Sequence, residues 1–215
     1  MLKTISIFIL IALSINLSAA DLTPASPNEI RPVLLSMPVP EVSLLTVEGK
    51  SVSLKSQLNG KPTVIVFYRG GWCPYCSLQL GGLKKIKIQL DKLGMQLIAV
   101  SPDRPEALKA SLNTAELDYT LLSDSKSDAI KAFGIGYVVD AKTLKQLKSY
   151  NIDLEKASGE THHMLPVPSI FIADSEAKLQ FSYVNPDYTA RLPESVILEA
   201  AKVIAERKQY LQPQM

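Results

Sequence analysis

The chain has 215 residues, of which 23 are Lys or Arg and 21 are Asp or Glu, so its formal net charge at pH 7 is only +2. The basic residues are scattered rather than gathered in a stripe, which argues against a nucleic-acid-binding surface. The length suffices for one domain with a sizeable core, and the sequence contains neither an internal repeat nor a low-complexity segment.

The first twenty residues have the pattern of a secretory signal peptide. Lys3 gives a short positive start, residues 5–17 are mostly apolar, and small residues precede Asp21. The apolar run is short for a membrane-spanning helix, which needs about 20 residues, so cleavage is favoured over an uncleaved anchor. We therefore expect residues 1–20 to be removed, a secreted or periplasmic protein, and no stable membrane insertion after cleavage.

The remaining sequence divides into a short arm and one domain. Residues 21–37 are rich in proline, serine and asparagine and predict an extended arm. Residues 38–211 are expected to form the domain. It opens with a short hairpin whose strands, near residues 42–44 and 52–54, flank a turn at residues 48–50.

Apolar strands and amphipathic helices then alternate. A β-branched run predicts a strand at residues 63–68, and apolar residues at helical spacing predict a helix over residues 76–93. The next predicted segments are a strand at 97–100, a helix at 105–112, a strand at 119–122 and a helix at 126–133. This order predicts an α/β fold with strands covered by helices on both faces.

The last third of the chain interrupts this alternation. Residues 135–166 have the character of an insertion, with a helix around residues 144–154. Residues 169–173 and 179–184 predict a hairpin, because turn-forming residues separate two apolar runs. Residues 192–210 predict a closing helix.

The only two cysteines, Cys73 and Cys76, stand three positions apart where the predicted strand at 63–68 passes into a helix. A helix N-terminus presents unpaired N–H groups and a partial positive charge, which favour thiolate over thiol. We therefore expect at least one cysteine to titrate below the free-thiol value of about 8.5. A structural bridge would close only a four-residue loop and contribute at most ~2 kcal/mol, so a redox centre is the better interpretation.

The motifs around this dithiol carry a family resemblance, which runs from about Pro38 to Ala205. Residues 72–76 (Trp-Cys-Pro-Tyr-Cys), followed far downstream by residues 166–168 (Pro-Val-Pro), resemble the thioredoxin fold. More narrowly, the chain resembles the peroxiredoxin-like branch of the alkyl hydroperoxide reductase and thiol-specific antioxidant family. The segments that carry this second resemblance are residues 67–76, 101–103, 122–124, 165–168 and 184–188. The resemblance implies a thioredoxin-like fold with a central mixed sheet and helices on both faces.

The chain departs from both patterns. The Pro-x-x-x-Thr-x-x-Cys motif of typical peroxiredoxins falls on Arg69, Cys73 and Cys76, and only the last position is kept. The distal-strand arginine of that family falls at about Pro168. From the thioredoxin side, Pro168 resembles the cis-proline that faces the dithiol, so a cis Val167–Pro168 bond is expected. The buried carboxylate of thioredoxins would fall at Phe67 and is missing.

The resemblance implies two mechanisms that exchange the roles of the cysteines. In a peroxidase, Cys76 attacks a hydroperoxide, Cys73 resolves the sulfenic acid, Arg69 holds the thiolate, and a thioredoxin-like protein recycles the disulfide. In a disulfide reductase acting on exported proteins, Cys73 attacks and Cys76 resolves. The peroxidase is the favoured interpretation, with Trp72 forming an apolar wall beside the thiols and Pro168 supporting them.

A third interpretation, from another class, is a copper-binding chaperone in which His162 or His163 joins the two sulfurs. Adjacent histidines on a polar loop are more often solvated, so no metal and no cofactor is expected. Asp187 and Arg191 also match family positions. They are interpreted as a structural ion pair without a chemical role.

Overall fold

The structure, a computed structural model, describes residues 23–210. The predicted leader at residues 1–20 lies outside the described residues. Within the described part of the chain, no helix is both long and apolar enough to cross a membrane. The arm is held against the domain by backbone hydrogen bonds, from Val33 N to Phe133 O and from Ser36 N to Leu179 O.

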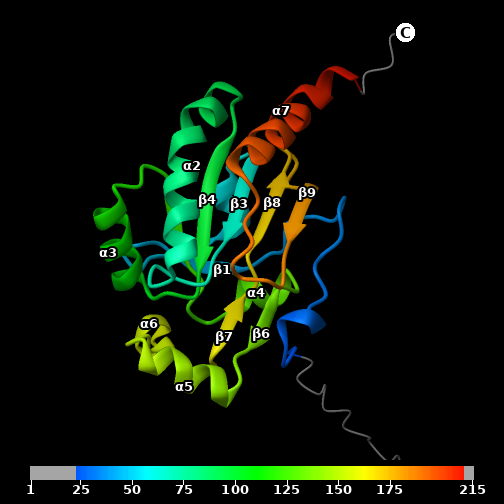
Figure 1. Cartoon of the computed structure of the whole chain (residues 1–215). Helices are drawn as coiled ribbons and strands as arrows, with labels where there is room; N and C mark the ends of the chain where they lie inside the picture. The colour runs from blue at the N-terminus through cyan, green and yellow to red at the C-terminus, as the bar shows by residue number, and fades with distance from the viewer. Residues whose placement is uncertain (1–22, 211–215) are drawn as a thin grey trace, which may run out of the picture.

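A mixed sheet of seven strands forms the centre, in the order β2-β1-β5-β4-β3-β8-β9 (Figure 1). β3, β4 and β5 are parallel, β8 runs antiparallel to β3, and β9 runs antiparallel to β8. β9 therefore points the same way as β3. The strands are β1 (Ser43–Leu45), β2 (Ser51–Ser53), β3 (Thr63–Phe67), β4 (Gln96–Ser101), β5 (Thr120–Ser123), β8 (Ser169–Ala173) and β9 (Leu179–Val184).

Helices cover both faces of the sheet, and Figure 1 shows α2 and α7 lying side by side across one of them. The elements are η1 (Pro27–Glu29), α1 (Leu54–Leu58), α2 (Pro74–Lys92), α3 (Pro105–Ala115), α4 (Asp128–Ala132), α5 (Ala141–Ser149), α6 (Leu154–Ser158) and α7 (Glu194–Tyr210). The predicted α/β fold with a central mixed sheet is confirmed.

The two faces of β3 belong to two separate apolar clusters, because successive side chains of a strand point to opposite sides. Val64 and Val66 pack with residues of α2, α3 and α7. Ile65 and Phe67 pack with residues of α1 and α4 on the other side. Both cysteines belong to the first cluster. The face of a strand residue therefore decides whether its side chain can reach the dithiol.

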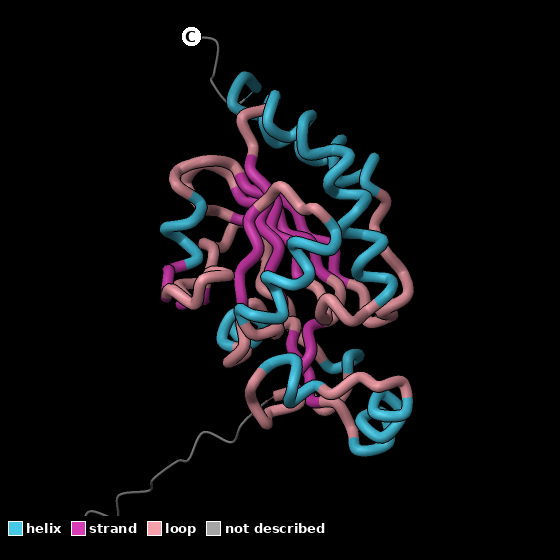
Figure 2. Tube along the Cα trace, turned by 90° about the vertical axis from the view of Figure 1, so that its left-hand side faces the viewer, coloured by secondary structure: helices cyan, strands magenta, loops and turns pink. Residues whose placement is uncertain are grey.

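The insertion at residues 135–166 forms a small unit beyond one end of the main sheet (Figure 2). It consists of α5, α6 and a two-stranded sheet of β6 (Gly136–Val138) and β7 (Met164–Pro166). The single helix predicted around residues 144–154 is wrong. The chain turns at Asn151, whose φ is +59°, and α6 begins anew because the Asp153 carboxylate accepts the Lys156 N–H.

Candidate active site

Three strands that run in the same direction end at one edge of the sheet, and the loop after each contributes to the site. The loop after β3 leads into the dithiol, the loop after β4 carries Asp103, and the loop after β9 carries Arg191. Strands that share a direction place their carboxyl ends at the same edge, where open α/β sheets usually bind ligands. Residues far apart in the sequence therefore meet around the sulfurs.

Cys73 is the N-cap residue of α2, with Pro74 at the first helical position and Cys76 in the first turn. Both thiols are free, and both residues are buried, Cys73 at 2% and Cys76 at 0% exposure. The turn before them is closed by a hydrogen bond from Cys73 N to Gly70 O of 3.2 Å. The pair thus lies at a helix start, as the sequence predicts, but beneath the surface.

Two glycines allow this turn to pack against a buried carboxylate. Gly70 has φ +149°, and a Cβ there would lie 2.3 Å from Trp72 Nε1 and 2.8 Å from Asp103 Oδ1. Gly71 N donates to Asp103 Oδ2 at 2.7 Å. Asp103 is 2% exposed, and burial raises the pKa of its carboxyl to about 6. Sequence reasoning gave Asp103 no role, although its Ser-Pro-Asp motif was part of the family resemblance.

Arg191 reaches the sulfurs, so its interpretation as a purely structural ion pair is wrong. Arg191 Nη2 donates to Cys76 Sγ at 3.3 Å and lies 4.0 Å from Cys73 Sγ. The Asp187 carboxylate instead accepts from both the backbone N–H and the hydroxyl of Thr189. That local turn directs the chain after β9 back towards α2. Because more than 100 residues separate Arg191 from the cysteines, the sequence does not reveal this contact.

Arg69 also lies beside the dithiol, but its guanidinium lies over two aromatic rings. Its Cζ lies 4.3 Å from the ring centroid of Tyr188 and 5.2 Å from that of Trp72. The residue is only 5% exposed. Its positive charge contributes to lowering the pKa of Cys73. No hydrogen bond or ion pair links its side chain to either sulfur among the contacts of the described residues.

The two thiols share one proton unequally. The pKa of Cys73 is lowered to about 6, first by the hydrogen bond from the Cys76 thiol and further by the Cys76 backbone N–H, Arg69 and Arg191. The pKa of Cys76 is raised, chiefly by burial and then by its hydrogen bond to Cys73. The thiolate therefore resides on Cys73 and the proton on Cys76. The expectation of an acidic thiol is confirmed.

Aromatic side chains line the outer rim. The ring of Tyr75 meets that of Tyr188 edge to face, with centroids 5.9 Å apart, and both residues are nearly half exposed. Trp72 packs inwards against two apolar clusters, the one that contains both cysteines, as expected, and that of the insertion, which contains Leu147 and Leu154. Trp72 therefore connects the dithiol turn to the insertion.

The cis Val167–Pro168 bond expected from the thioredoxin resemblance is wrong, because residues 23–210 contain no cis peptide bond. The chain stays extended here between two paired strands. Val167 N donates to Ile135 O beside β6, and Pro168 O accepts from Asn185 N beyond β9. A trans Val167–Pro168 bond therefore joins the residue that pairs beside β6 to the residue that pairs beyond β9.

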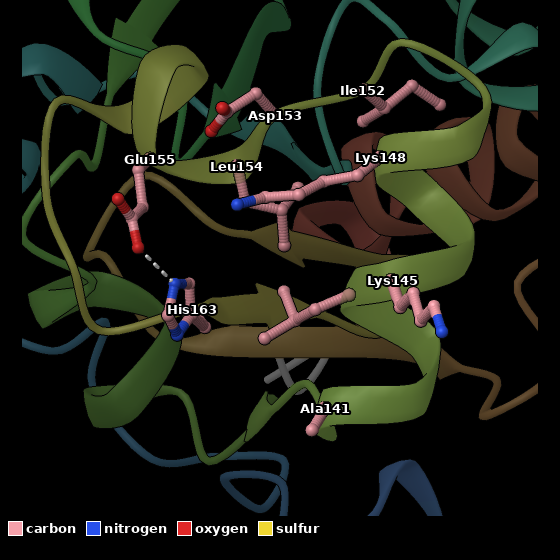
Figure 3. A pocket seen from close by; sticks show the side chains of 9 residues that line it. Ala141, Lys145, Lys148, Ile152, Asp153, Leu154, Glu155 and His163 are labelled. Carbon is pink, nitrogen blue, oxygen red and sulfur yellow. Dashed lines mark hydrogen bonds and ion pairs between the residues drawn. The ribbon is translucent and has the colours of Figure 1, made fainter.

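Neither histidine turns towards the sulfurs. His162 Nε2 lies 2.7 Å from Ser125 O and 3.0 Å from Ser127 Oγ, while its Nδ1 accepts from Met164 N. The interpretation of His162 as a solvated residue is therefore wrong. His163 Nε2 lies 2.7 Å from Glu155 Oε1, at the rim of a hollow of about 320 Å³ beside α5 and α6 (Figure 3).

The described residues hold no cluster of three or more His, Cys, Asp and Glu side chains able to bind a metal ion. His162 and His163, which the copper interpretation placed beside the sulfurs, contact other protein groups instead. The pair of sulfurs, two arginines and a buried carboxylate are the groups that the fold assembles. Together they can stabilise a thiolate and pass a proton between two thiols, which is redox chemistry of sulfur.

Comparison with known proteins agrees with this chemistry. Residues 35–182 match the profile of the AhpC/TSA family. The chain is 36% identical over 106 residues to the putative peroxiredoxin Bcp of Haemophilus influenzae, covering 49% of this chain and 68% of the relative. It is 31% identical over 96 residues to peroxiredoxin Bcp of Escherichia coli, covering 45% and 61%. The matches thus span about two thirds of these relatives.

Solved structures confirm the thioredoxin-like fold. Peroxiredoxin 6 of Arenicola marina superposes with a TM-score of 0.67 at 18% identity, covering 82% of this chain and 76% of that one. Peroxidoxin BcpB of Mycobacterium tuberculosis gives a TM-score of 0.60 at 17% identity, covering 79% and 97%.

Proposed function

This chain belongs to the AhpC/TSA family, and we propose that it is a thiol-dependent peroxidase that reduces hydroperoxides through Cys73 and Cys76. The observation that carries the proposal is the buried pair of free sulfurs with the Arg191 guanidinium 3.3 Å from Cys76 Sγ. A buried thiolate beside a fixed positive charge suits attack on a small, uncharged oxidant. The relatives named as peroxiredoxins support this assignment.

The reaction has two steps on the protein. A thiolate sulfur attacks one oxygen of the hydroperoxide, the O–O bond breaks, and the other oxygen leaves as water or an alcohol after taking a proton. The second sulfur, now a thiolate, then attacks the sulfenic sulfur, the S–O bond breaks as the disulfide forms, and the hydroxide leaves as water after taking a proton from solvent. An external dithiol protein of the thioredoxin type restores both thiols by exchange.

We assign the attack to Cys76. Its position matches the cysteine of the peroxidase motif, and Arg191 lies nearer to its sulfur than to that of Cys73. The resting thiolate is on Cys73, so the proton must first cross the hydrogen bond between the two sulfurs.

Single substitutions test the assignment. Cys73→Ser should consume about one equivalent of hydrogen peroxide and stop as a sulfenic acid on Cys76, because the resolving thiol is gone. Cys76→Ser should be inert. Peroxide consumption and dimedone labelling followed by mass spectrometry give both readings. A sulfenic acid on Cys73 in Cys76→Ser would reverse the roles, and a wild type that ignores peroxide would reject the peroxidase.

A disulfide reductase is the second candidate, and the lowered pKa of Cys73 favours it. The burial of both sulfurs opposes it, since a protein disulfide cannot approach a thiolate that is 2% exposed without movement of the surrounding chain. Cys76→Ser would then trap mixed disulfides with protein clients through Cys73, and the wild type would reduce insulin faster than peroxide.

The leader-like sequence at residues 1–20 supports an exported location, secreted or periplasmic, with a thioredoxin-like reductant in the same compartment. The intact mass of the protein recovered from that compartment is the measurement. A chain beginning near Asp21 is expected. A chain that keeps residues 1–20 in the membrane fraction would favour an anchor.

A further inference from the structure

The segment that carries Arg191 leaves the sheet beside the position where the family resemblance places a strand arginine. That position is Pro168, immediately before β8. β8 and β9 are paired so that Ser169 lies opposite Val184, and Asn185 N donates to Pro168 O at 3.2 Å. The loop at residues 185–193 therefore starts next to the site of the missing arginine.

Two contacts fix this loop over the dithiol. The Asp187 carboxylate accepts from Thr189 N and Thr189 Oγ1, which closes the turn. The Tyr188 ring lies over the Arg69 guanidinium and against the Tyr75 ring. Held in this way, the loop directs the Arg191 side chain to the sulfurs instead of to solvent.

Two nitrogens of the Arg191 guanidinium have no hydrogen-bond partner among the described residues. Nη2 contacts the sulfurs, whereas Nε and Nη1 are buried without a hydrogen-bond partner in the described part of the chain. Buried donors without partners are costly in a folded protein. A hydroperoxide offers two acceptor oxygens of the right size for such donors. Arg69 Nε is likewise buried without a partner, but aromatic rings lie close to the Arg69 guanidinium, and among the described contacts its side chain makes no hydrogen bond to a sulfur.

We propose that Arg191 is the arginine that binds the hydroperoxide and stabilises cleavage of its O–O bond, in place of the strand arginine that Pro168 replaces. The inference rests on the proposed peroxidase function. The thiolate sulfur forms a bond to the nearer oxygen while the O–O electron pair moves to the farther oxygen. Arg191 N–H groups hold that oxygen as negative charge develops, and it then takes a proton from the partner thiol and leaves.

Two rates measured on the same protein distinguish binding of the oxidant from acidification of the thiol. One is the second-order rate of oxidation of Cys76 by hydrogen peroxide. The other is the rate of alkylation of Cys73 by iodoacetamide, which depends only on how much of the pair's resting thiolate is present. Arg191→Met should lower the peroxide rate by about 100-fold or more, as loss of a transition-state donor does. The alkylation rate should fall much less.

Three further variants complete the experiment. Arg191→Lys keeps the charge and should retain alkylation while still losing peroxide rate, because the forked donors are gone. Arg69→Met should lower both rates together, since Arg69 acts only through the acidity of the thiol. Lys202→Met removes an exposed positive charge from α7 and should change neither rate.

The outcomes are separable. Equal losses of both rates in Arg191→Met, or no loss of either, would overturn the inference while leaving the peroxidase intact. A selective loss of peroxide rate in Arg69→Met would transfer the role to Arg69 and also overturn it. A wild type without peroxide activity would reject the proposed function itself. Thermal unfolding of each variant shows whether a lost rate reflects a lost fold.

Discussion

Replacement of Cys76 tests what makes Cys73 acidic. The largest contribution to its lowered pKa is the hydrogen bond from the Cys76 thiol, ahead of the backbone N–H and the two arginines. A hydrogen bond to a charged group is worth about 1.5–3 kcal/mol, and one pKa unit corresponds to about 1.4 kcal/mol. Cys76→Ala should therefore raise the pKa of Cys73 from about 6 to about 7–8.

Cys76→Ser is the matched control, because its hydroxyl can still donate to the Cys73 sulfur. We expect its Cys73 to titrate near the wild-type value. At pH 7 the thiolate fraction should be about nine tenths in the wild type and about one tenth to one half in Cys76→Ala.

Thiolate absorbance recorded against pH gives the pKa of Cys73 in both variants, and the pH dependence of iodoacetamide alkylation checks it. A Cys76→Ala protein that titrates like Cys76→Ser would refute the reasoning. The helix N-terminus and the arginines would then set the acidity without the second thiol.

Three other predictions follow from buried groups and glycines. The pKa of Asp103 is about 6 in the folded chain, whereas an unfolded chain has an aspartate pKa of about 3.9. Ionisation of Asp103 should therefore lower the free energy of unfolding by about 3 kcal/mol as pH rises from about 4 to 6. Asp103→Asn should lose that slope in urea unfolding, and a variant with the wild-type slope would contradict the assignment. A Cβ on Gly81 in α2 would meet no atom within 4 Å, so Gly81→Ala should raise the free energy of unfolding by about 1 kcal/mol. Gly70→Ala should lower the free energy of unfolding and slow peroxide reduction. A Gly70→Ala protein with the melting temperature of the wild type would show that the turn tolerates a Cβ. The ring centroid of Phe133 lies 4.7 Å from that of Phe67 and 4.9 Å from that of Phe171. Phe133→Ala should therefore lower the free energy of unfolding by about 3–5 kcal/mol. A loss below about 1 kcal/mol would mean that the core collapses to fill the cavity.

Periodicity revealed most of the sheet because the central strands and their helices bury side chains at regular spacing. The strand predicted at residues 63–68 is β3 (Thr63–Phe67), and the helix predicted at 76–93 is α2 (Pro74–Lys92). The sequence predicts the helices of the insertion less accurately. Its two helices are too short for a clear period, and their boundary depends on Asp153 as a cap, which an apolar pattern does not reveal.

The dithiol could be found from sequence because its chemistry depends on local spacing at a helix start. Arg191 could not, since its role depends on a contact across 115 positions. The pattern Asp187-x-Thr189 indicates a tight turn, and such a turn shortly before an arginine is the one signal that could have suggested a directed side chain. The cis-proline was predicted from the thioredoxin pattern alone, and the strand pairing on both sides of Pro168 decided otherwise.

The missing carboxylate and the missing arginine have one explanation in the topology of the sheet. The Phe67 side chain belongs to the cluster on the face opposite the dithiol, so a carboxylate there could not approach the sulfurs. β4 and β9 run in the same direction as β3, and their carboxyl ends meet the dithiol turn at one edge. A charged group can therefore sit after a neighbouring strand and still occupy the same region of space. Asp103 after β4 and Arg191 after β9 both reach the dithiol turn in this way, although neither lies at the sequence position where the motifs place a carboxylate or an arginine.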